Sequence, residues 1–210
     1  MTKQVLIIDG DYNYVRLFTS FGFAVFSDVN MLPFCDLVVF TGGEDVTPSY
    51  YKEKQHPCTY NSLFRDAYEK KVFDAAIEAN IPCVGICRGG QFLNVMNGGK
   101  MYQHVESHTR DHYIEVLDVE APFESVLATS THHQMMRAGP SAVMLAKANL
   151  GGFKQYMGEE GVVFQEKDEE DTEVLFYPHT KCLCFQPHPE FNPSDELAEL
   201  FHYFITKYCF

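Results

Sequence analysis

The feature that most constrains this sequence lies at residues 81–99, where a strand pattern changes abruptly into a helix pattern. Residues 81–86 are short, apolar and rich in β-branched side chains, as a buried parallel strand is. From Gln91 onward the apolar residues recur at helical spacing, and Gly98-Gly99 ends the run as a helix C-cap does. Cys87 therefore lies where a strand turns directly into a helix.

This junction predicts a nucleophile elbow built on sulfur. Glycines at positions 85, 89 and 90 remove side chains that would block so tight a turn. In an elbow the reactive atom is held above the sheet edge, and backbone N–H groups point to one side of it. A helix N-terminus also lowers the pKa of a thiol. The elbow context favours a nucleophile over a buried packing cysteine, but a nucleophile also requires a base.

Length and composition predict one globular domain over residues 1–210. Hydrophobic residues make up 46% of the chain, and no Pro/Gly/Ser-rich linker divides it. We find no signal peptide or membrane-spanning stretch, and the seven cysteines form no disulfide framework, so we expect a cytoplasmic protein. The net charge of −13 argues against nucleic acid or an anionic membrane as a partner.

The first half of the chain predicts alternating strands and helices. We expect strands at residues 5–8, 23–26 and 37–40, a helix capped by Asp11, and a helix capped by Asn61 or Ser62. The apolar face of the second helix is expected to consist of Phe64, Tyr68, Val72, Ala76 and Ile77. With the strand at residues 81–86, this order implies a mostly parallel sheet covered by helices on both faces.

The second half predicts a small antiparallel β section. Its strands are expected at residues 113–119, 142–148, 155–165 and 173–177. A buried strand then returns at residues 183–186, and Ser194 is expected to cap a final helix. Residues 159–173 hold eight carboxylates and one lysine. This acidic segment is expected to form a solvated hairpin turn, with a docking patch for a basic partner as the alternative.

Two further segments leave strands at the edge that carries Cys87. The strand at residues 37–40 runs into Gly42-Gly43, whose bare amides suit the ligand-binding edge of an open α/β sheet. His188 and Glu190 follow the strand at residues 183–186. Residues two apart in extended backbone point the same way, and the flanking prolines favour that conformation. The histidine is therefore positioned to accept the proton of Cys87, with the glutamate fixing its tautomer.

Together these motifs resemble those of the class I glutamine amidotransferase superfamily. The closest likeness is to its γ-glutamyl hydrolase branch, which is peptidase C26-like and includes γ-glutamyl-γ-aminobutyrate hydrolases. The likeness rests on residues 85–91 and 186–190. Support comes from residues 41–46, 65–66, 93–95, 98–99 and 132–134, which occur in the family's order. We expect a three-layer, flavodoxin-like α/β fold from this resemblance.

The resemblance also implies the roles of individual residues. Cys87 would be the nucleophile, His188 the base and Glu190 its orienting partner. The oxyanion hole would use the backbone amides of Gly43 and Arg88. Gln91 and the loop at His133 would hold the α-amino-acid end of a small-molecule γ-glutamyl substrate. The implied reaction cleaves the γ-carboxamide of glutamine or a γ-glutamyl amine through a thioester, without a cofactor.

Other functions remain open at this stage. One is a glutaminase subunit that feeds ammonia to a separate synthetase. A non-catalytic binding relative is disfavoured by the intact Cys-His-Glu set. Another cysteine-elbow amidase or protease on a related fold is disfavoured by the late Pro-His-Pro-Glu motif.

A metal site is the remaining alternative. The spacing of His104, His108 and His112 would align three zinc ligands on a helix. The residues between them show no apolar stripe, so we expect no helix and no metal site there. Cys182 and Cys184 alternate with Leu183 inside a strand and are expected to be buried packing residues.

Overall fold

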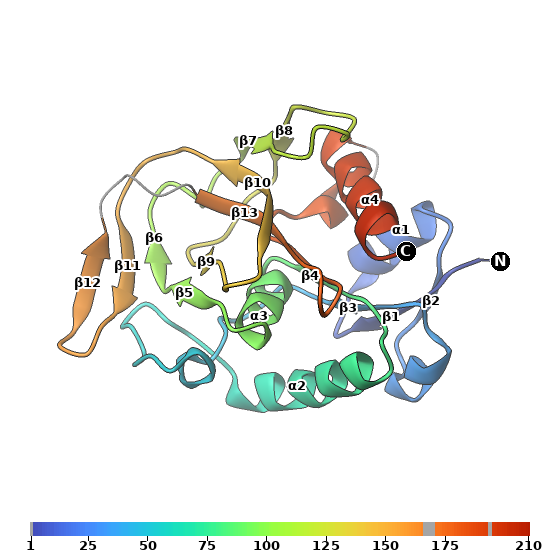
Figure 1. Ribbon diagram of the computed structural model, residues 1–210, viewed down its shortest axis with the longest axis horizontal. Coiled ribbons are helices and arrows are strands. Elements are labelled where there is room, and N and C mark those ends of the chain that lie inside the picture. The colour runs from blue at the N-terminus through green and yellow to red at the C-terminus, as the bar shows by residue number, and fades with distance from the viewer. Residues whose placement is uncertain (1, 166–170, 193–194) are drawn as a thin grey trace.

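The computed structural model describes residues 2–165, 171–192 and 195–210, and a nine-stranded sheet forms its centre (Figure 1). The described strands are β1 (Gln4–Ile8), β2 (Ala24–Phe26), β3 (Leu37–Phe40), β4 (Cys83–Ile86), β5 (Lys100–Tyr102), β6 (His104–Val105), β7 (His112–Val116), β8 (Ser125–Ala128), β9 (Met135–Arg137), β10 (Val143–Ala148), β11 (Lys154–Met157), β12 (Val162–Gln165), β13 (Asp171–Tyr177) and β14 (Cys182–Phe185). The described α-helices are α1 (Tyr12–Ser20), α2 (Leu63–Glu78), α3 (Arg88–Met96) and α4 (Glu196–Tyr208).

The sheet joins a parallel half to an antiparallel half. Its strand order is β2-β1-β3-β4-β14-β13-β10-β7-β8. Neighbours from β2 to β14 pair in parallel, and the strands from β13 to β8 continue the sheet antiparallel. The parallel half is the α/β core predicted from sequence, and the antiparallel section is continuous with it. Two smaller sheets, β12-β11-β6 and β5-β9, lie beside this large one.

Helices cover both faces of the parallel half, as predicted. Strand alternation in β1 sends Val5 and Ile7 to one face and Leu6 and Ile8 to the other. The first pair packs in a core with α1 and α4, and the second pair packs with α2 and α3. Full burial of each such side chain stabilises the fold by about 1.5–3 kcal/mol. Figure 1 shows the two helix layers on opposite sides of the sheet.

Most of the expected boundaries are correct. The ends of β1 to β4 lie within two residues of the predicted ones, and the side chains of Asp11 and Ser62 cap α1 and α2. The expected single strand at residues 155–165 is instead the hairpin β11–β12. The short strands β5, β6, β8 and β9 have no counterpart in the prediction, because two to four residues are too few to show a period.

The predicted inner face of α2 is wrong in its first two turns. Phe64 is 88% exposed and Tyr68 is 38% exposed. Asp66 and Glu69 are fully buried in their place. The helix is rotated because both carboxylates pair with Arg88, a buried partner that apolar spacing in the sequence does not reveal.

The acidic segment is not a solvated turn throughout. Residues 166–170 lie outside the described residues, but Asp171 and Glu173 are buried on β13. Burial alone would raise the pKa of Glu173, yet its contacts with His112 and His132 outweigh burial and lower it to about 2. Ser194 also lies outside the described residues, and Asp195 caps α4 by accepting the Ala198 N–H.

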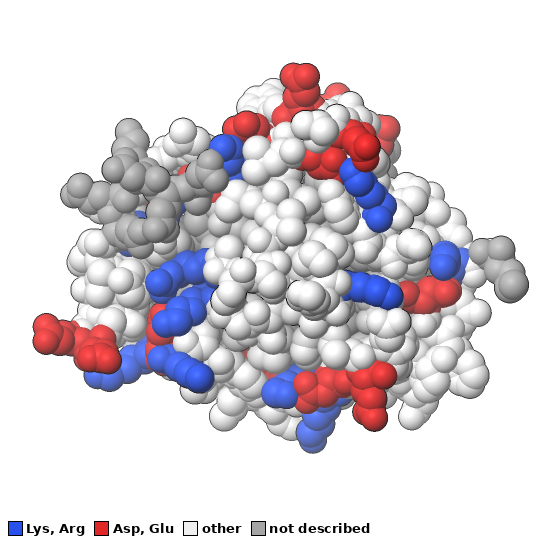
Figure 2. Space-filling model, in the orientation of Figure 1, with Lys and Arg blue, Asp and Glu red and all other residues white. Residues whose placement is uncertain are grey.

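Surface charge on the face of Figure 1 is divided into separate groups. Figure 2 shows the Lys and Arg side chains of that face in small clusters, several of them beside Asp or Glu. Among the ion pairs of the described residues, Lys70 pairs with Asp74 at 2.6 Å and Arg137 with Glu53 at 3.0 Å. None of the described helices has both the length and the apolar character needed to cross a bilayer.

Candidate active site

Cys87 occupies a strained turn between β4 and α3. Its φ is +52° and its ψ is −115°, which is unusual for a residue with a side chain. Its N–H donates to Phe185 O at 2.8 Å, which ties the turn to β14. A Cβ added to Gly89 would collide with the backbone oxygen of Phe40. Only glycine therefore lets α3 approach β3 closely enough to hold this geometry.

His188 and Glu190 lie at the same sheet edge as Cys87. Because β14 pairs with β4 in parallel, their carboxyl ends meet, and His188 follows the end of β14. His188 Nδ1 lies 2.7 Å from Glu190 Oε1, and the imidazole stacks on Phe191 at 4.7 Å between ring centroids. The backbone N–H of His188 donates to Thr129 O at 3.0 Å. The ring is thus held by Glu190 and Phe191 beside the Cys87 thiol, and the main chain is held by Thr129.

The environment of His188 favours its protonated form. Burial by itself would lower its pKa. Hydrogen bonds to Cys87 and Glu190, together with the negative charge of both, outweigh burial and raise the pKa to about 10. The Glu190 carboxylate therefore orients and stabilises a protonated imidazole beside the Cys87 side chain.

Two contacts at this site were not anticipated from sequence. Thr131 Oγ1 lies 3.0 Å from His188 Nε2, and the Gly42 N–H donates to the Tyr14 hydroxyl at 3.0 Å. Burial and the nearby Glu190 carboxylate raise the pKa of that hydroxyl well above its usual range. In the sequence, Tyr14 follows the helical spacing of Phe18 and Phe21, which indicates only an apolar helix face. The position of Thr131 beside His132-His133-Gln134 was the one available signal for its role.

Gly43 and Arg88, the predicted oxyanion-hole residues, both line a cavity of about 370 Å³ together with Cys87 and His188. The Arg88 N–H is at the first turn of α3, where backbone donors have no partner within the helix. Gly43 has a φ of +143°, and its peptide N–H points opposite to the Gly42 carbonyl. Since Arg65 Nη2 donates to that carbonyl at 2.9 Å, the N–H of Gly43 is turned away from Arg65.

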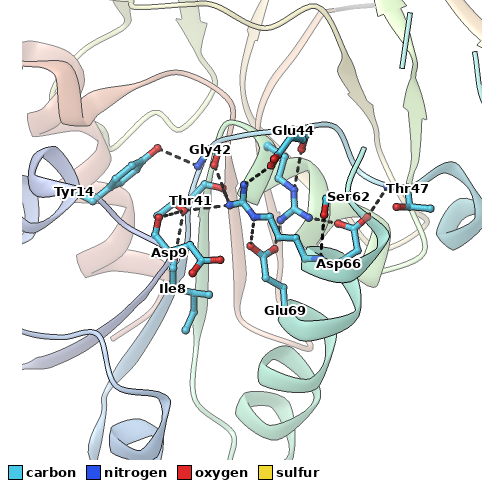
Figure 3. A network of polar contacts seen from close by, with 12 residues as sticks. Ile8, Asp9, Tyr14, Thr41, Gly42, Glu44, Thr47, Ser62, Asp66 and Glu69 are labelled. Carbon is cyan, nitrogen blue, oxygen red and sulfur yellow. Dashed lines mark hydrogen bonds and ion pairs between the residues drawn. The ribbon is translucent and has the colours of Figure 1, made fainter. Parts of the chain in front are cut away.

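Buried ion pairs fasten this loop and the elbow to α2 (Figure 3). The Arg88 guanidinium pairs with both Asp66 and Glu69, and its Nε donates to Glu44 O at 3.2 Å. Arg65 Nε donates to Glu69 Oε1 at 2.8 Å. Glu69 therefore bridges the arginine of the elbow and the arginine that holds Gly42.

The two predicted substrate-binding residues face the same cavity. Gln91 is buried, and its Nε2 donates to Gln186 Oε1 at 3.1 Å and to Gln134 O at 3.3 Å. His133 Nε2 lies 3.2 Å from Asp45 Oδ1, and this contact outweighs burial and raises the pKa of His133. The remaining lining residues of the cavity are Glu44, Asp45, Tyr60, Thr131, His132 and Gln134. Charges of both signs suit an amino acid, which carries an ammonium and a carboxylate.

Comparisons with known proteins point to one family. The peptidase C26 family model matches residues 27–149. A glutamine amidotransferase-like protein, the YvdE homolog of Lactococcus lactis subsp. cremoris, is 38% identical over 127 residues, covering 51% of this chain and 67% of that protein. The γ-glutamyl-γ-aminobutyrate hydrolase PuuD of Escherichia coli (strain K12) is 27% identical over 154 residues, covering 68% of this chain and 59% of that protein. The chain thus spans about two thirds or less of these relatives' own length.

Solved structures show the same fold at low sequence identity. A glutamine amidotransferase from Thermotoga maritima matches with a TM-score of 0.60 at 16% identity, over 90% of this chain and 77% of that chain. The glutaminase domain of Trypanosoma brucei CTPS, solved with bound acivicin, matches with a TM-score of 0.59 at 11% identity, over 97% of this chain and 93% of that chain. The chain therefore has the class I glutamine amidotransferase-like fold.

The raised pKa of His188 predicts a pH dependence. Because it exceeds the usual value of about 6.5, protonated His188 stabilises the folded state. Its contribution to the free energy of unfolding is fully present below pH ~6.5. It is lost as the pH rises through the pKa of His188 in the folded state. NMR titration of the imidazole should give a midpoint of about 10 in the wild type, and a lower one in Cys87→Ala. Equal midpoints in the two proteins would contradict a Cys87–His188 contact.

The buried ion pairs predict a large effect of one glutamate. Glu69→Gln should lower the free energy of unfolding by about 3–5 kcal/mol, because it removes the carboxylate shared by Arg88 and Arg65 and leaves part of their buried charge uncompensated. Asp74→Asn on the same helix is the matched control, since Asp74 pairs with Lys70 at the exposed surface. That change should cost under about 1 kcal/mol. Urea denaturation measures both, and similar losses in the two variants would refute the bridging role of Glu69.

Proposed function

The chain belongs to the peptidase C26 family, and from this premise we propose that it is a cysteine-nucleophile amidohydrolase acting on γ-glutamyl compounds. Its substrate would be glutamine or a γ-glutamyl amine, and its products glutamate and ammonia or the amine. The observation that carries the proposal is the convergence at one sheet edge of the strained Cys87 and the hydrogen-bonded pair of His188 and Glu190. Family membership and the hydrolase among its relatives support hydrolytic activity.

The proposed reaction has two halves. The Cys87 thiolate attacks the γ-carbonyl carbon, and the N–H groups of Gly43 and Arg88 stabilise the oxyanion. The C–N bond breaks as His188 donates its proton to the departing nitrogen, leaving a γ-glutamyl thioester. His188 then takes a proton from water, the hydroxide attacks the thioester, and glutamate and the thiolate are released. Glu190 holds the imidazole tautomer and stabilises the imidazolium throughout.

Binding of the α-amino-acid end is assigned to the cavity wall. Contact with Asp45 favours the cationic form of His133, which suits the substrate's α-carboxylate. Glu44 and Asp45 suit its α-ammonium group. Gln91 completes this wall, with its amide already oriented by two hydrogen bonds.

A second candidate function is a glutaminase subunit that supplies ammonia to a synthetase. The similarity in fold to the CTPS glutaminase domain favours it. Activity on glutamine that rises on adding a synthetase would support this alternative over a free-standing γ-glutamyl hydrolase.

A substrate panel tests the proposal. Glutamine, γ-glutamyl-aminobutyrate, γ-glutamyl-polyamines and poly-γ-glutamate are incubated with the protein, and released glutamate and amine are quantified. We expect equal amounts of both from at least one substrate and none above background with Cys87→Ala. His202→Gln, on α4, is the control variant and should turn over like the wild type. Wild-type turnover in Cys87→Ala would refute the proposed nucleophile.

Labelling by a glutamine-analogue electrophile should select one cysteine. Acivicin is expected to modify Cys87, because Cys87 lines the cavity, whereas Cys35, Cys83, Cys182, Cys184 and Cys209 are buried and do not line it. Cys58 is exposed and serves as an internal control. Iodoacetamide should reach Cys58 irrespective of any active site, whereas acivicin should not. Peptide mapping that finds acivicin mainly on Cys58 would argue against a glutamine site.

The proposed role of Glu190 predicts a loss confined to turnover. Glu190→Gln keeps a hydrogen-bond partner for His188 but removes the charge that stabilises the imidazolium. We expect kcat to fall by up to about 10⁴-fold with KM little changed. Glu196→Gln, an exposed glutamate on α4, is the control. A steep rise in KM at constant kcat would instead mean that Glu190 binds substrate.

A further inference from the structure

A second cluster of histidines lies beside the candidate active site. His108 lies in the loop before β7 and His112 is the first residue of β7. His132 comes from the loop that carries Thr131, and Glu173 is on β13. All four side chains are at least nine-tenths buried. The sequence expectation that His104, His108 and His112 share no helix is correct. Tertiary structure nevertheless brings the last two together with His132 and Glu173.

The imidazoles converge on one carboxylate oxygen. The distance to Glu173 Oε1 is 3.1 Å from His112 Nε2, 3.7 Å from His132 Nε2 and 3.8 Å from His108 Nε2. In a tetrahedral zinc site with bonds of about 2.0–2.1 Å, ligand atoms are separated by about 3.3–3.5 Å. The three distances to Glu173 Oε1 bracket that value, and the ligand atoms of His108, His112 and Glu173 all lie within 4.8 Å of one another. His132, placed by its distance to Glu173 alone, would complete the set.

The opposite nitrogen of each ring fixes its tautomer. The Nδ1 atoms of His108, His112 and His132 lie 2.7, 2.9 and 2.8 Å from the backbone oxygens of Glu106, Arg110 and Gln134. A carbonyl oxygen only accepts, so each Nδ1 carries the proton. In a neutral ring the Nε2 lone pair therefore points toward Glu173. Metal-bound histidines are oriented in the same way by a hydrogen bond from their other nitrogen.

Contacts within the cluster leave several of its buried hydrogen-bonding atoms without a partner in the part of the chain that the structure describes. His112 Nε2 is within hydrogen-bond distance of Glu173 Oε1. His108 Nε2, His132 Nε2 and Glu173 Oε2 are buried and have no hydrogen-bond partner among the described residues. A proton on His112 satisfies one contact and leaves these three atoms unpaired, which is costly in a buried place.

We infer that His108, His112, His132 and Glu173 bind one divalent cation, with zinc as the metal that fits best. Three imidazole nitrogens and one carboxylate oxygen are ligands that zinc accepts in tetrahedral geometry. Asp171 Oδ2 lies 3.5 Å from His108 Nε2 and also accepts the Leu150 N–H at 2.9 Å, so it is a neighbouring carboxylate outside the proposed ligand set. Four protein ligands leave no open position for water, so the site is structural.

A cation here would position the wall of the candidate active site. His132 is adjacent to Thr131, whose hydroxyl contacts His188. The Nδ1 atom of His132 contacts the Gln134 carbonyl oxygen, which also accepts a hydrogen bond from Gln91. On β13, Glu173 O accepts the Gln186 N–H two residues before His188. The metal would therefore hold the loop at residues 129–134 to β13 and orient residues on both sides of the cavity.

Metal content tests this site without reference to activity. Cys87→Ala is used as the background, so that zinc on the proposed nucleophile is not counted. The protein is loaded with zinc, dialysed and analysed by mass spectrometry of the metal. We expect about one zinc per chain, X-ray absorption showing nitrogen and oxygen near 2.0 Å without sulfur near 2.3 Å, and a melting temperature that falls with a chelator.

Variants locate the metal. His108→Gln in the same background should weaken zinc affinity by at least ~100-fold, beyond the 10–100-fold typical of changes outside the ligands. His104→Gln is the matched control, four residues earlier on β6, and should bind zinc like its parent. If His108→Gln does not fold, the stoichiometry and absorption spectrum of its parent decide the question. Less than about a tenth of a zinc per chain, sulfur ligation, or equal affinity in both variants would overturn the inference.

Discussion

The elbow and the loop that faces it depend on the buried pairing of Arg88 with Asp66 and Glu69. An arginine in the first turn of a helix is unfavourable, because the N-terminus of the helix dipole is itself positive. Two carboxylates from α2 compensate both charges. Glu69 also binds Arg65, which holds the Gly42 carbonyl, so one network orients both proposed oxyanion donors. Breaking a buried pair is costly, and this cost favours a single arrangement of the three segments.

Parallel pairing explains why residues far apart in sequence meet. The carboxyl ends of β3, β4 and β14 are neighbours in the sheet, and they lead into Gly42-Gly43, Cys87 and His188. Specific contacts hold Cys87 and His188 in place. Cys87 is fixed by a strained φ and a hydrogen bond to β14, and His188 by Glu190, Thr129 and the Phe191 ring. These groups are ordered before any substrate binds, which lowers the cost of reaching a reactive geometry.

The antiparallel half of the sheet supplies the other wall of the cavity. The loop at residues 129–134 joins β8 to β9 and brings Thr131 against His188 and His133 against Asp45. Beneath it lies the histidine cluster centred on Glu173. The part of the site assigned to substrate recognition therefore rests on the buried histidine cluster, whereas the elbow rests on close backbone packing and on the buried Arg88 pairs.

Sequence alone determined the features that depend on local chemistry. The strand-to-helix junction at Cys87, the cap at Asp11, and the placement of His188 and Glu190 after a strand follow from periodicity, capping side chains, glycine and proline. For the second helix the sequence left Asn61 and Ser62 open, and the structure selects Ser62. Tertiary structure decided which charged side chains are buried and which residues they pair with. Glu69 and Glu173 look like solvent-facing carboxylates in the sequence, and both are fully buried. Their partners lie 19 residues away in Arg88 and 61 residues away in His112. Burying a charge is favourable only where the fold brings a partner to it, and no local pattern records that partner.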